Sequence, residues 1–225
     1  AEADTEFLAR MDADDLSVHG RIAAQLDWLR AHPGAIACGT DYELFGEMTG
    51  RVRVPRTDRA CRQRGRLASP HCGASMVWRR VPAQAAGLRF DPDFAHAEDY
   101  DYFSRLAGLG TVANLPIVGY RYLIHRGQVS DRFEAPQQAA HLRIAHRTAQ
   151  QQGRAPLPDA VLVDLLWSRE GGTRRPGPVA AAAARTPRRE SGRRRACALG
   201  VPRSPGDGAA AAAAAARSAP REAAP

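Results

Sequence analysis

Three aspartates lie close together near the start of the sequence and follow a short apolar segment. Residues 7–11 read FLARM, and Asp12, Asp14 and Asp15 come next. This order is typical of a buried strand that ends at a polar edge. Side chains two positions apart in an extended chain point to the same side, so Asp12 and Asp14 can converge on one hard cation, Mg²⁺ or Mn²⁺, that bridges to substrate phosphates. The alternative is helix capping, in which Asp15 or Ser17 accepts hydrogen bonds from free amides.

A second acidic group stands in the middle of the chain. Glu98, Asp99 and Asp101 open a segment of helical character, just after His96 and a turn-rich stretch. A carboxylate in that place can face an open cleft and act as a general base. Acids are also common at the start of a helix for capping alone, and the motif by itself leaves both interpretations open.

Basic residues follow in a third segment, GYRYLIH at positions 119–125. Next to a cleft, Arg121 and His125 can hold a diphosphate through charge-assisted hydrogen bonds. The alternative is an edge strand whose basic side chains are solvated. Taken alone, this segment does not distinguish the two.

Apolar spacing and turn residues predict the elements that position these side chains. Extended segments are expected at residues 7–11, 35–45, 73–80 and 111–122. Helices are expected between Ser17, a candidate N-cap, and Pro33, and at residues 98–106, 135–152 and 159–167. Residues 51–66 carry seven arginines without periodicity and are expected to form a loop.

The charge of the chain is unevenly distributed. The formal net charge is +8, from 32 arginines against 24 acidic residues. Residues 1–170 hold 21 of each, so the whole surplus lies in residues 171–225. A folded nucleic-acid-binding domain would carry its basic patch on its own surface, and a neutral segment argues against nucleic acid as a partner.

The C-terminal part has a different composition from the rest. From about residue 169 the chain is almost entirely Ala, Arg, Pro, Gly and Ser, with too few large apolar side chains to offset the entropy of ordering. The sequence therefore predicts one domain over residues 1–168 and a disordered tail over residues 169–225. An interaction tail and a reading-frame artefact remain alternatives for the second segment.

Several cellular locations are disfavoured by sequence. No window reaches the roughly 18 to 20 continuous apolar residues of a membrane span, and the acidic N-terminus is unlike a secretory signal. The four cysteines have no CxxC spacing that would indicate a zinc site or a disulfide scaffold. A cytoplasmic location fits best, and a peripheral position at the inner face of the membrane stays open.

Together, the segments resemble a known family in their order and spacing. The segments LARMDADD, IACGT, SMVWRR, FAHAEDYDYFSR and NLPIVGYRYLIH stand in the order found in the C-terminal two thirds of glycosyltransferase family 2. The resemblance covers about residues 5–132. It implies a GT-A fold, a Rossmann-like mixed α/β sheet flanked by helices.

The resemblance also implies roles for particular residues. Asp12 and Asp14 match the DxD acids that bind a divalent metal, Mn²⁺ or Mg²⁺, which holds the nucleotide-sugar diphosphate. Asp99 matches the catalytic base of the family, with Glu98 beside it. Substrate-binding roles fall on three further residues, namely Asp15, Arg121 and His125.

The implied reaction is an inverting glycosyl transfer. A sugar passes from a nucleotide-sugar donor to a hydroxyl of a saccharide or lipid-linked acceptor, as in the synthesis of cell-surface polysaccharides or glycoconjugates. The family begins with strands that grip the nucleotide, and nothing upstream of Ala1 supplies them. An inactive transferase fragment that acts at most as a binding module is therefore the alternative, and a metal-dependent phosphotransferase is a weaker one, because Leu16 breaks its motif.

Overall fold

A mixed β-sheet forms the centre of the fold. The computed structural model describes residues 3–125, 134–167, 169–170 and 173–174. The strands of the sheet are β1 (Phe7–Ala9), β2 (Leu16–Ser17), β3 (Ala35–Gly46), β4 (Gly50–Val52), β5 (Val77–Arg79) and β6 (Thr111–Ile124). Their order is β1-β5-β3-β6-β2, with β4 paired to β3. Strands β3 and β6 run parallel and the other pairs are antiparallel, so the predicted mixed α/β class is confirmed.

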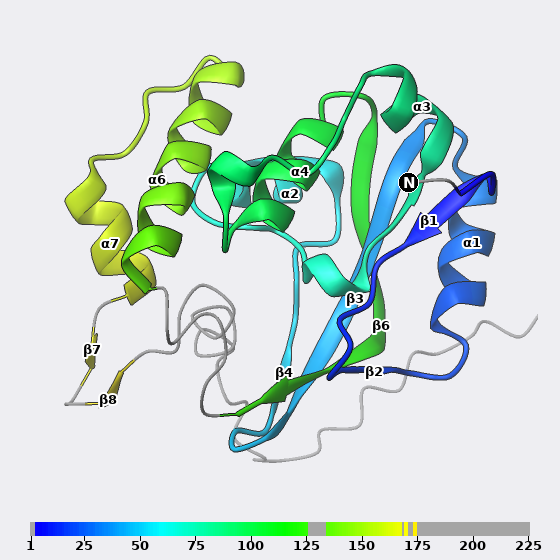
Figure 1. Ribbon diagram of the computed structural model, residues 1–225, viewed down its shortest axis with the longest axis horizontal. Helices are drawn as coiled ribbons and strands as arrows, with labels where there is room; N and C mark the ends of the chain where they lie inside the picture. Colours follow the sequence, from blue (N-terminus) through cyan, green and yellow to red (C-terminus); the bar gives the residue numbers. More distant parts are fainter. Residues whose placement is uncertain (1–2, 126–133, 168, 171–172, 175–225) are drawn as a thin grey trace, which may run out of the picture. The chain divides into compact units, whose positions relative to one another are not determined.

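Strands β3 and β6 are the long central pair of the sheet (Figure 1). Burial is continuous along β3 from Ala35 to Tyr42, as expected for a strand covered on both faces. Pro116 stands in β6 where the pairing with β3 shifts register between Thr40 and Asp41. The shift is explained by proline, which has no N–H to donate to the ladder. The extended segments predicted at 35–45 and 111–122 are confirmed.

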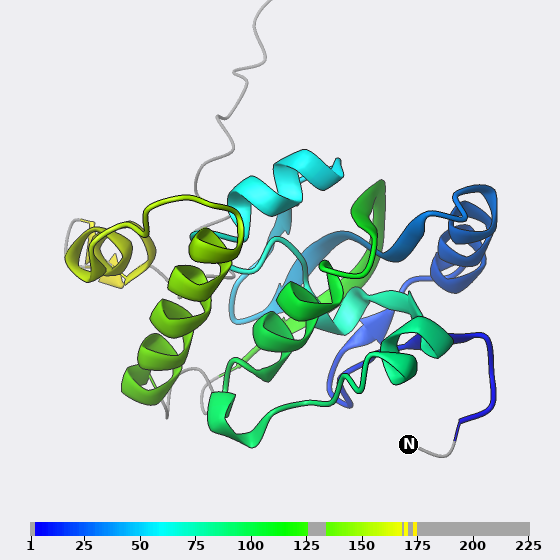
Figure 2. The same ribbon diagram turned by 90° about the horizontal axis from the view of Figure 1, so that it is seen from above.

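Helices cover both faces of the sheet. They are α1 (Arg21–Ala31), α2 (Asp58–Arg64), α3 (Arg80–Ala85), α4 (Glu98–Leu106), α6 (Glu134–Gln151) and α7 (Asp159–Trp167), with short 3₁₀ turns η1 (Gly73–Ser75) and η2 (Pro92–Phe94). On one face, Leu29 of α1 packs with Cys38 and Val77. On the other face, α2, α3 and α4 pack against Ala37 and Met76. Figure 2 shows α1 and α4 on opposite sides of the strands.

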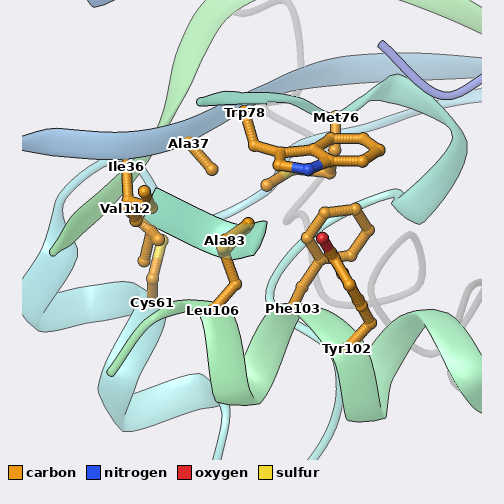
Figure 3. Close-up of a cluster of buried hydrophobic side chains, with 10 residues drawn as sticks. All are labelled: Ile36, Ala37, Cys61, Met76, Trp78, Ala83, Tyr102, Phe103, Leu106 and Val112. Atoms are coloured by element: carbon orange, nitrogen blue, oxygen red, sulfur yellow. The ribbon is translucent and has the colours of Figure 1, made fainter. Parts of the chain in front are cut away.

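One contact between the sheet and helix α4 is aromatic. Trp78 of β5 faces Tyr102 and Phe103 of α4, with ring centroids 5.7 and 5.5 Å apart (Figure 3). Both pairs are edge-on, the arrangement that ring quadrupoles favour. This cluster fixes α4 against the sheet, and α4 carries the second acidic group.

Helices α6 and α7 add a further layer beyond α4. Ile144 of α6 packs with Tyr100 of α4, and Leu166 of α7 packs with Ala68. Asp101 of α4 is fully buried and pairs with Arg147 of α6 at 2.7 Å. The predicted helices at 98–106, 135–152 and 159–167 are confirmed to within one residue.

The arginine-rich segment 51–66 is not a loop throughout, which makes that prediction wrong. Its second half forms α2, whose N-cap Thr57 accepts a hydrogen bond from the backbone N–H of Ala60. Two of its arginines have a buried partner: Arg51 and Arg56 lie 3.1 and 2.7 Å from the carboxylate of Asp41. Helix α2 shows no apolar periodicity because Cys61 is its one buried residue. The pairing of Arg51 and Arg56 with Asp41 depends on a residue outside the segment, so no local pattern reveals it.

Two other expectations need correction. Of the predicted strand 73–80, only Val77–Arg79 is extended, between η1 and α3. Ser17 is not the N-cap of α1; that position is Gly20, whose φ of 80° suits a residue without a β-carbon. The strand predicted at 7–11 is confirmed over Phe7–Ala9, but it is only half-buried because it lies at the edge of the described sheet.

Loss of the Thr57 cap should weaken the fold modestly. We expect Thr57→Ala to lower the free energy of unfolding by about 1 kcal/mol, because the amide of Ala60 loses its acceptor. Thr57→Ser keeps the hydroxyl and is expected to stay close to wild type. Urea unfolding followed by circular dichroism measures both; equal stability of the Ala and Ser variants would contradict the cap.

Acid should destabilise the domain through His71. His71 is buried, its Nδ1–H donates to Oδ1 of Asn114 at 3.0 Å, and burial lowers its pKa from 6.5 to about 4. Between about pH 6.5 and pH 4, His71 therefore binds a proton in the unfolded chain but not in the folded chain. The free energy of unfolding should fall as the pH drops from about 6.5 to about 4, by up to about 1.4 kcal/mol per pH unit from this residue, and His71 should contribute no slope above that window.

The measurement compares urea unfolding of wild type and His71→Gln across that pH window. Glutamine keeps a polar partner for Asn114 but does not titrate, so its pH slope should be shallower. Parallel slopes for the two proteins would show that His71 is not the acid-sensitive group.

The predicted tail falls almost wholly outside the described residues. Within 169–225 the structure describes only β7 (Arg169–Glu170) and β8 (Thr173–Arg174), which pair antiparallel. The division at residue 168 and the disorder of the tail stay predictions. None of the helices in the described part of the chain combines the length and apolar character needed to cross a bilayer.

Candidate active site

The DADD segment forms a turn after β1. Asp15 donates its backbone N–H to the carbonyl of Asp12 at 3.4 Å, and the strand has already ended at Ala9. The expectation that alternation along an extended chain aligns Asp12 with Asp14 is therefore wrong. Aspartates favour turns because their short carboxylates bond the local backbone. Capping of α1 by Asp15 or Ser17 is also wrong, since the N-cap of α1 makes no side-chain hydrogen bond.

Asp12 and Asp14 both present carboxylates to solvent. The backbone N–H of Asp12 donates to the hydroxyl of Tyr120 at 3.0 Å, which ties the turn to β6. The side chain of Asp12 is 39% exposed and that of Asp14 is 52% exposed. Nε2 of His125 lies 3.5 Å from Oδ2 of Asp14, so the structure brings together the first and third predicted groups.

Asp15 points inward instead. It is buried, and its Oδ1 accepts the backbone N–H of Leu123 at 2.7 Å. Burial raises its pKa, although the hydrogen bonds from Leu123 and Tyr120 oppose the change. Through these contacts Asp15 connects the turn to β6. Its predicted contact with substrate stays a prediction.

Arg10 connects the first acidic group to the second. Its Nη2 lies 3.4 Å from Oδ1 of Asp12 and 3.4 Å from Oε1 of Glu98. Burial disfavours the charged guanidinium, but the carboxylates of Asp99, Asp12 and Glu98 outweigh that cost and raise the pKa of Arg10. One cation thus stands between both pairs of predicted functional acids.

Asp99 lies in the first turn of α4, half-buried. Its Oδ1 accepts the backbone N–H of Tyr100 at 2.6 Å, and free amides at a helix start favour a negative charge there. The N-cap is Ala97, without a side-chain hydrogen bond, so neither Glu98 nor Asp99 occupies the capping position. A β-carbon on residue 73 would collide with the carboxylate of Asp99, and only glycine fits at Gly73.

Buried polar side chains of α1 hold the loop that supports Asp99. Gln25 donates from Nε2 to the carbonyls of Cys38 and Ser75 at 2.8 and 2.9 Å. Arg21 donates to the carbonyl of Ala74 at 3.3 Å. Residues 73–75 are thereby fixed against the sheet, and Gly73 keeps its position beneath Asp99.

Cys72 is a buried cysteine whose thiol is influenced by the charges of the acidic cluster. Its thiol is buried, and burial, followed by the charges of Asp99 and Asp15, raises its pKa to about 12. A thiol that stays protonated at neutral pH is a poor nucleophile. Cys72 therefore contributes packing.

Two predicted residues lie away from the cluster. Arg121 is exposed and its guanidinium stands over the ring of Phe45 at 4.9 Å. Because successive side chains of a strand point to opposite faces, Arg121 faces away from its neighbour Tyr120, which contacts Asp12. Asp101 is engaged in the buried ion pair with Arg147. A substrate contact of Arg121 stays a prediction, and the described geometry lends it no support.

Asp12 and Asp14 are the candidate oxygen ligands for a hard divalent cation. No group of three or more His, Cys, Asp or Glu side chains in the described ranges is arranged to hold a metal. Mg²⁺ and Mn²⁺ prefer oxygen ligands, and Mg²⁺ is commonly held by one or two carboxylates plus substrate phosphates. The exposed carboxylates of Asp12 and Asp14 fit that pattern.

The sequence interpretation gave no role to Arg10 and Gly73, and it included Tyr120 in the third segment without a role of its own. Arg10 lies in the apolar segment FLARM, two positions before Asp12. An arginine in an apolar segment could have indicated an ion pair, because a cation that is removed from water needs an acidic partner. Gly73 and Tyr120 carry no local signal, because their roles come from contacts with Asp99 and Asp12 in distant segments.

Comparison with known proteins finds distant relatives. No protein-family model matches the chain. An uncharacterized glycosyltransferase of Haemophilus influenzae is 25% identical over 150 residues, 62% of this chain and 46% of that protein. The amylovoran biosynthesis glycosyltransferase AmsE of Erwinia amylovora is 30% identical over 114 residues, 49% of this chain and 42% of that protein. The chain thus spans less than half the length of these curated relatives.

A solved structure shares the fold. TarS (residues 1–349) of S. aureus, in complex with UDP-GlcNAc, superposes with a TM-score of 0.50 over 71% of this chain and 46% of TarS, at 13% sequence identity. A likeness at that identity concerns the fold alone. The chain is therefore similar in sequence to two glycosyltransferases and similar in fold to TarS.

Proposed function

We propose that the chain carries the catalytic acids of a metal-dependent, inverting glycosyltransferase of the family 2 type, with a GT-A fold. The observation that carries the proposal is the meeting of two acidic groups at one cation, with Arg10 within 3.4 Å of both Asp12 and Glu98. A transferase needs carboxylates for two tasks, holding a metal and removing a proton. The turn after β1 supplies the acids proposed to hold the metal. The start of α4 supplies the acids proposed to remove the proton.

The proton transfer falls to Asp99. Its carboxylate accepts the proton of the acceptor hydroxyl as the hydroxyl oxygen bonds to the anomeric carbon of the donor sugar. The bond from that carbon to the diphosphate breaks on the opposite side, so the configuration inverts and the diphosphate leaves with the electron pair. Packing on Gly73 and the hydrogen bond from Tyr100 hold the carboxylate in one orientation.

Asp12 and Asp14 are the proposed holders of Mn²⁺ or Mg²⁺. When bound, the cation would stabilise the negative charge of the leaving diphosphate. His125 lies beside Asp14, and its proposed role is to contact the same phosphates. The guanidinium of Arg10 limits the repulsion between the acid pairs.

The comparisons support a nucleotide-sugar donor without identifying it. The structural neighbour TarS was solved with UDP-GlcNAc, and one sequence relative is named for the biosynthesis of amylovoran. We propose a biosynthetic transfer to a saccharide or lipid-linked acceptor. The choice of sugar depends on residues that these similarities do not specify.

Isothermal titration with nucleotides tests the proposal. UDP, GDP and dTDP are titrated separately, each with Mn²⁺ and with EDTA in its place. At least one nucleotide should release heat only when Mn²⁺ is present. Absence of binding for all three would favour the alternative, an inactive fragment that acts at most as a binding module.

A further inference from the structure

An open pocket lies beside the proposed active site. It has a volume of about 600 Å³ and is bounded by β1, β5, α3 and the start of the segment that leads to α4. Its aromatic residues are Trp78, Phe90 and Tyr102, joined by Leu8 on β1. This volume lies in the range of pockets that bind small molecules.

Arg10 contacts both the pocket residue Phe90 and the acidic cluster. Leu8 and Arg10 lie two positions apart, and the backbone N–H of Arg10 still bonds the carbonyl of Met76 in the manner of the strand ladder. Both side chains therefore point to the same face of the sheet. The guanidinium of Arg10 stands 5.8 Å from the ring centroid of Phe90, so Phe90 is the point where the pocket meets the acids.

Helix α4 connects the pocket to the proposed base as well. Tyr102 follows Asp99 by three positions, so the two side chains are neighbours on one side of the helix. Phe90 stacks on Tyr102 with ring centroids 4.5 Å apart and an interplanar angle of 23°. Phe90 therefore contacts α4 at the residue one helical turn after Asp99.

The lining has the chemistry of a sugar site. Phe90 is 46% exposed, although its stack on Tyr102 covers part of the ring. The electron-rich face of an aromatic ring attracts the C–H groups on the apolar side of a pyranose, while the sugar hydroxyls need polar partners. Gln84 and Arg89, both exposed, supply such partners at the rim, and no acidic residue belongs to the described lining.

We propose that this pocket binds the acceptor saccharide, with one sugar ring packed on Phe90 and a hydroxyl directed to Asp99. The inference rests on the proposed glycosyl transfer and names the side from which the acceptor enters. Neither Asp12 nor Asp14 lines the pocket, so the proposed donor site and the proposed acceptor site use different residues. Arg89 and the absence of acids favour neutral or anionic acceptors over cationic ones.

The test uses saturation-transfer NMR on the chain with a panel of methyl glycosides: the α- and β-glucoside, the β-galactoside, the N-acetyl-β-glucosaminide and the β-glucuronide. At least one glycoside should receive saturation on its ring C–H protons. Phe90→Ala should reduce that signal at least about fivefold, because the ring supplies the stacking face, and Phe90→Trp should retain it. Ile117→Ala, a partly exposed apolar residue outside the pocket, is the matched control and should leave the signal unchanged.

Each alternative outcome overturns the inference. The inference is wrong if none of the glycosides receives saturation. It is also wrong if wild type and Phe90→Ala give equal signals. Self-association in sedimentation velocity that Phe90→Ala abolishes, without any glycoside signal, would assign the pocket to a second copy of the chain. The nucleotide titration is independent of these results, so a failure of the acceptor site is distinguishable from a failure of the transferase proposal.

Discussion

Asp99→Asn is expected to lower the turnover of the enzyme by roughly 10²- to 10⁴-fold, with little change in donor binding. The amide has the size and shape of the carboxylate, so it fits the space next to Gly73 and can still accept from the amide of Tyr100. It cannot take a proton from an acceptor hydroxyl at neutral pH. Initial rates of sugar transfer, together with titration of the donor nucleotide, separate the chemical step from binding.

Two comparisons make that result specific. Asp27→Asn removes an exposed carboxylate of α1 whose ion pair is with Arg30 on the same helix, and it should leave turnover unchanged. If the only task of Asp99 were to favour the start of α4, asparagine would serve nearly as well and turnover would stay near normal. That outcome would remove Asp99 from the mechanism and with it the main reason for an inverting transfer.

Asp14→Asn should abolish nucleotide binding that depends on Mn²⁺. A neutral amide is a much weaker ligand for a hard cation, and even changes behind the first ligands typically cost 10- to 100-fold in metal affinity. We therefore expect the affinity for the nucleotide in the presence of Mn²⁺ to fall by more than about 100-fold. The side chain is half exposed, so the free energy of unfolding should change little.

The metal-free titration is the internal control for this variant. In EDTA, wild type and Asp14→Asn should bind the nucleotide equally weakly, because the difference between them lies only in the metal. Unchanged affinity for both Mn²⁺ and nucleotide in the variant would refute the metal-binding role of Asp14, and Asp12→Asn would then show whether the other carboxylate acts alone.

Much of the secondary structure follows from short-range pattern. The helix over Glu98–Leu106 and the strands over Ala35–Gly46 and Thr111–Ile124 were predictable because apolar spacing and turn residues act within a few positions. The same logic failed at α2, a short polar helix in which Cys61 is the one buried residue, so it shows no apolar periodicity. It failed again at residues 12–15, where a turn replaces the expected extended chain.

The sequence by itself provided the candidate residues: two groups of acids, the order of the segments around them, and a resemblance that predicts a task for each group. Only the tertiary structure decided how they meet. Arg10 reaches Glu98 across 88 positions, and Asp15 bonds Leu123 across 108. Contacts at such separations leave no local signature, because the free energy that selects them comes from burial and charge pairing in the folded chain rather than from the propensity of any one segment.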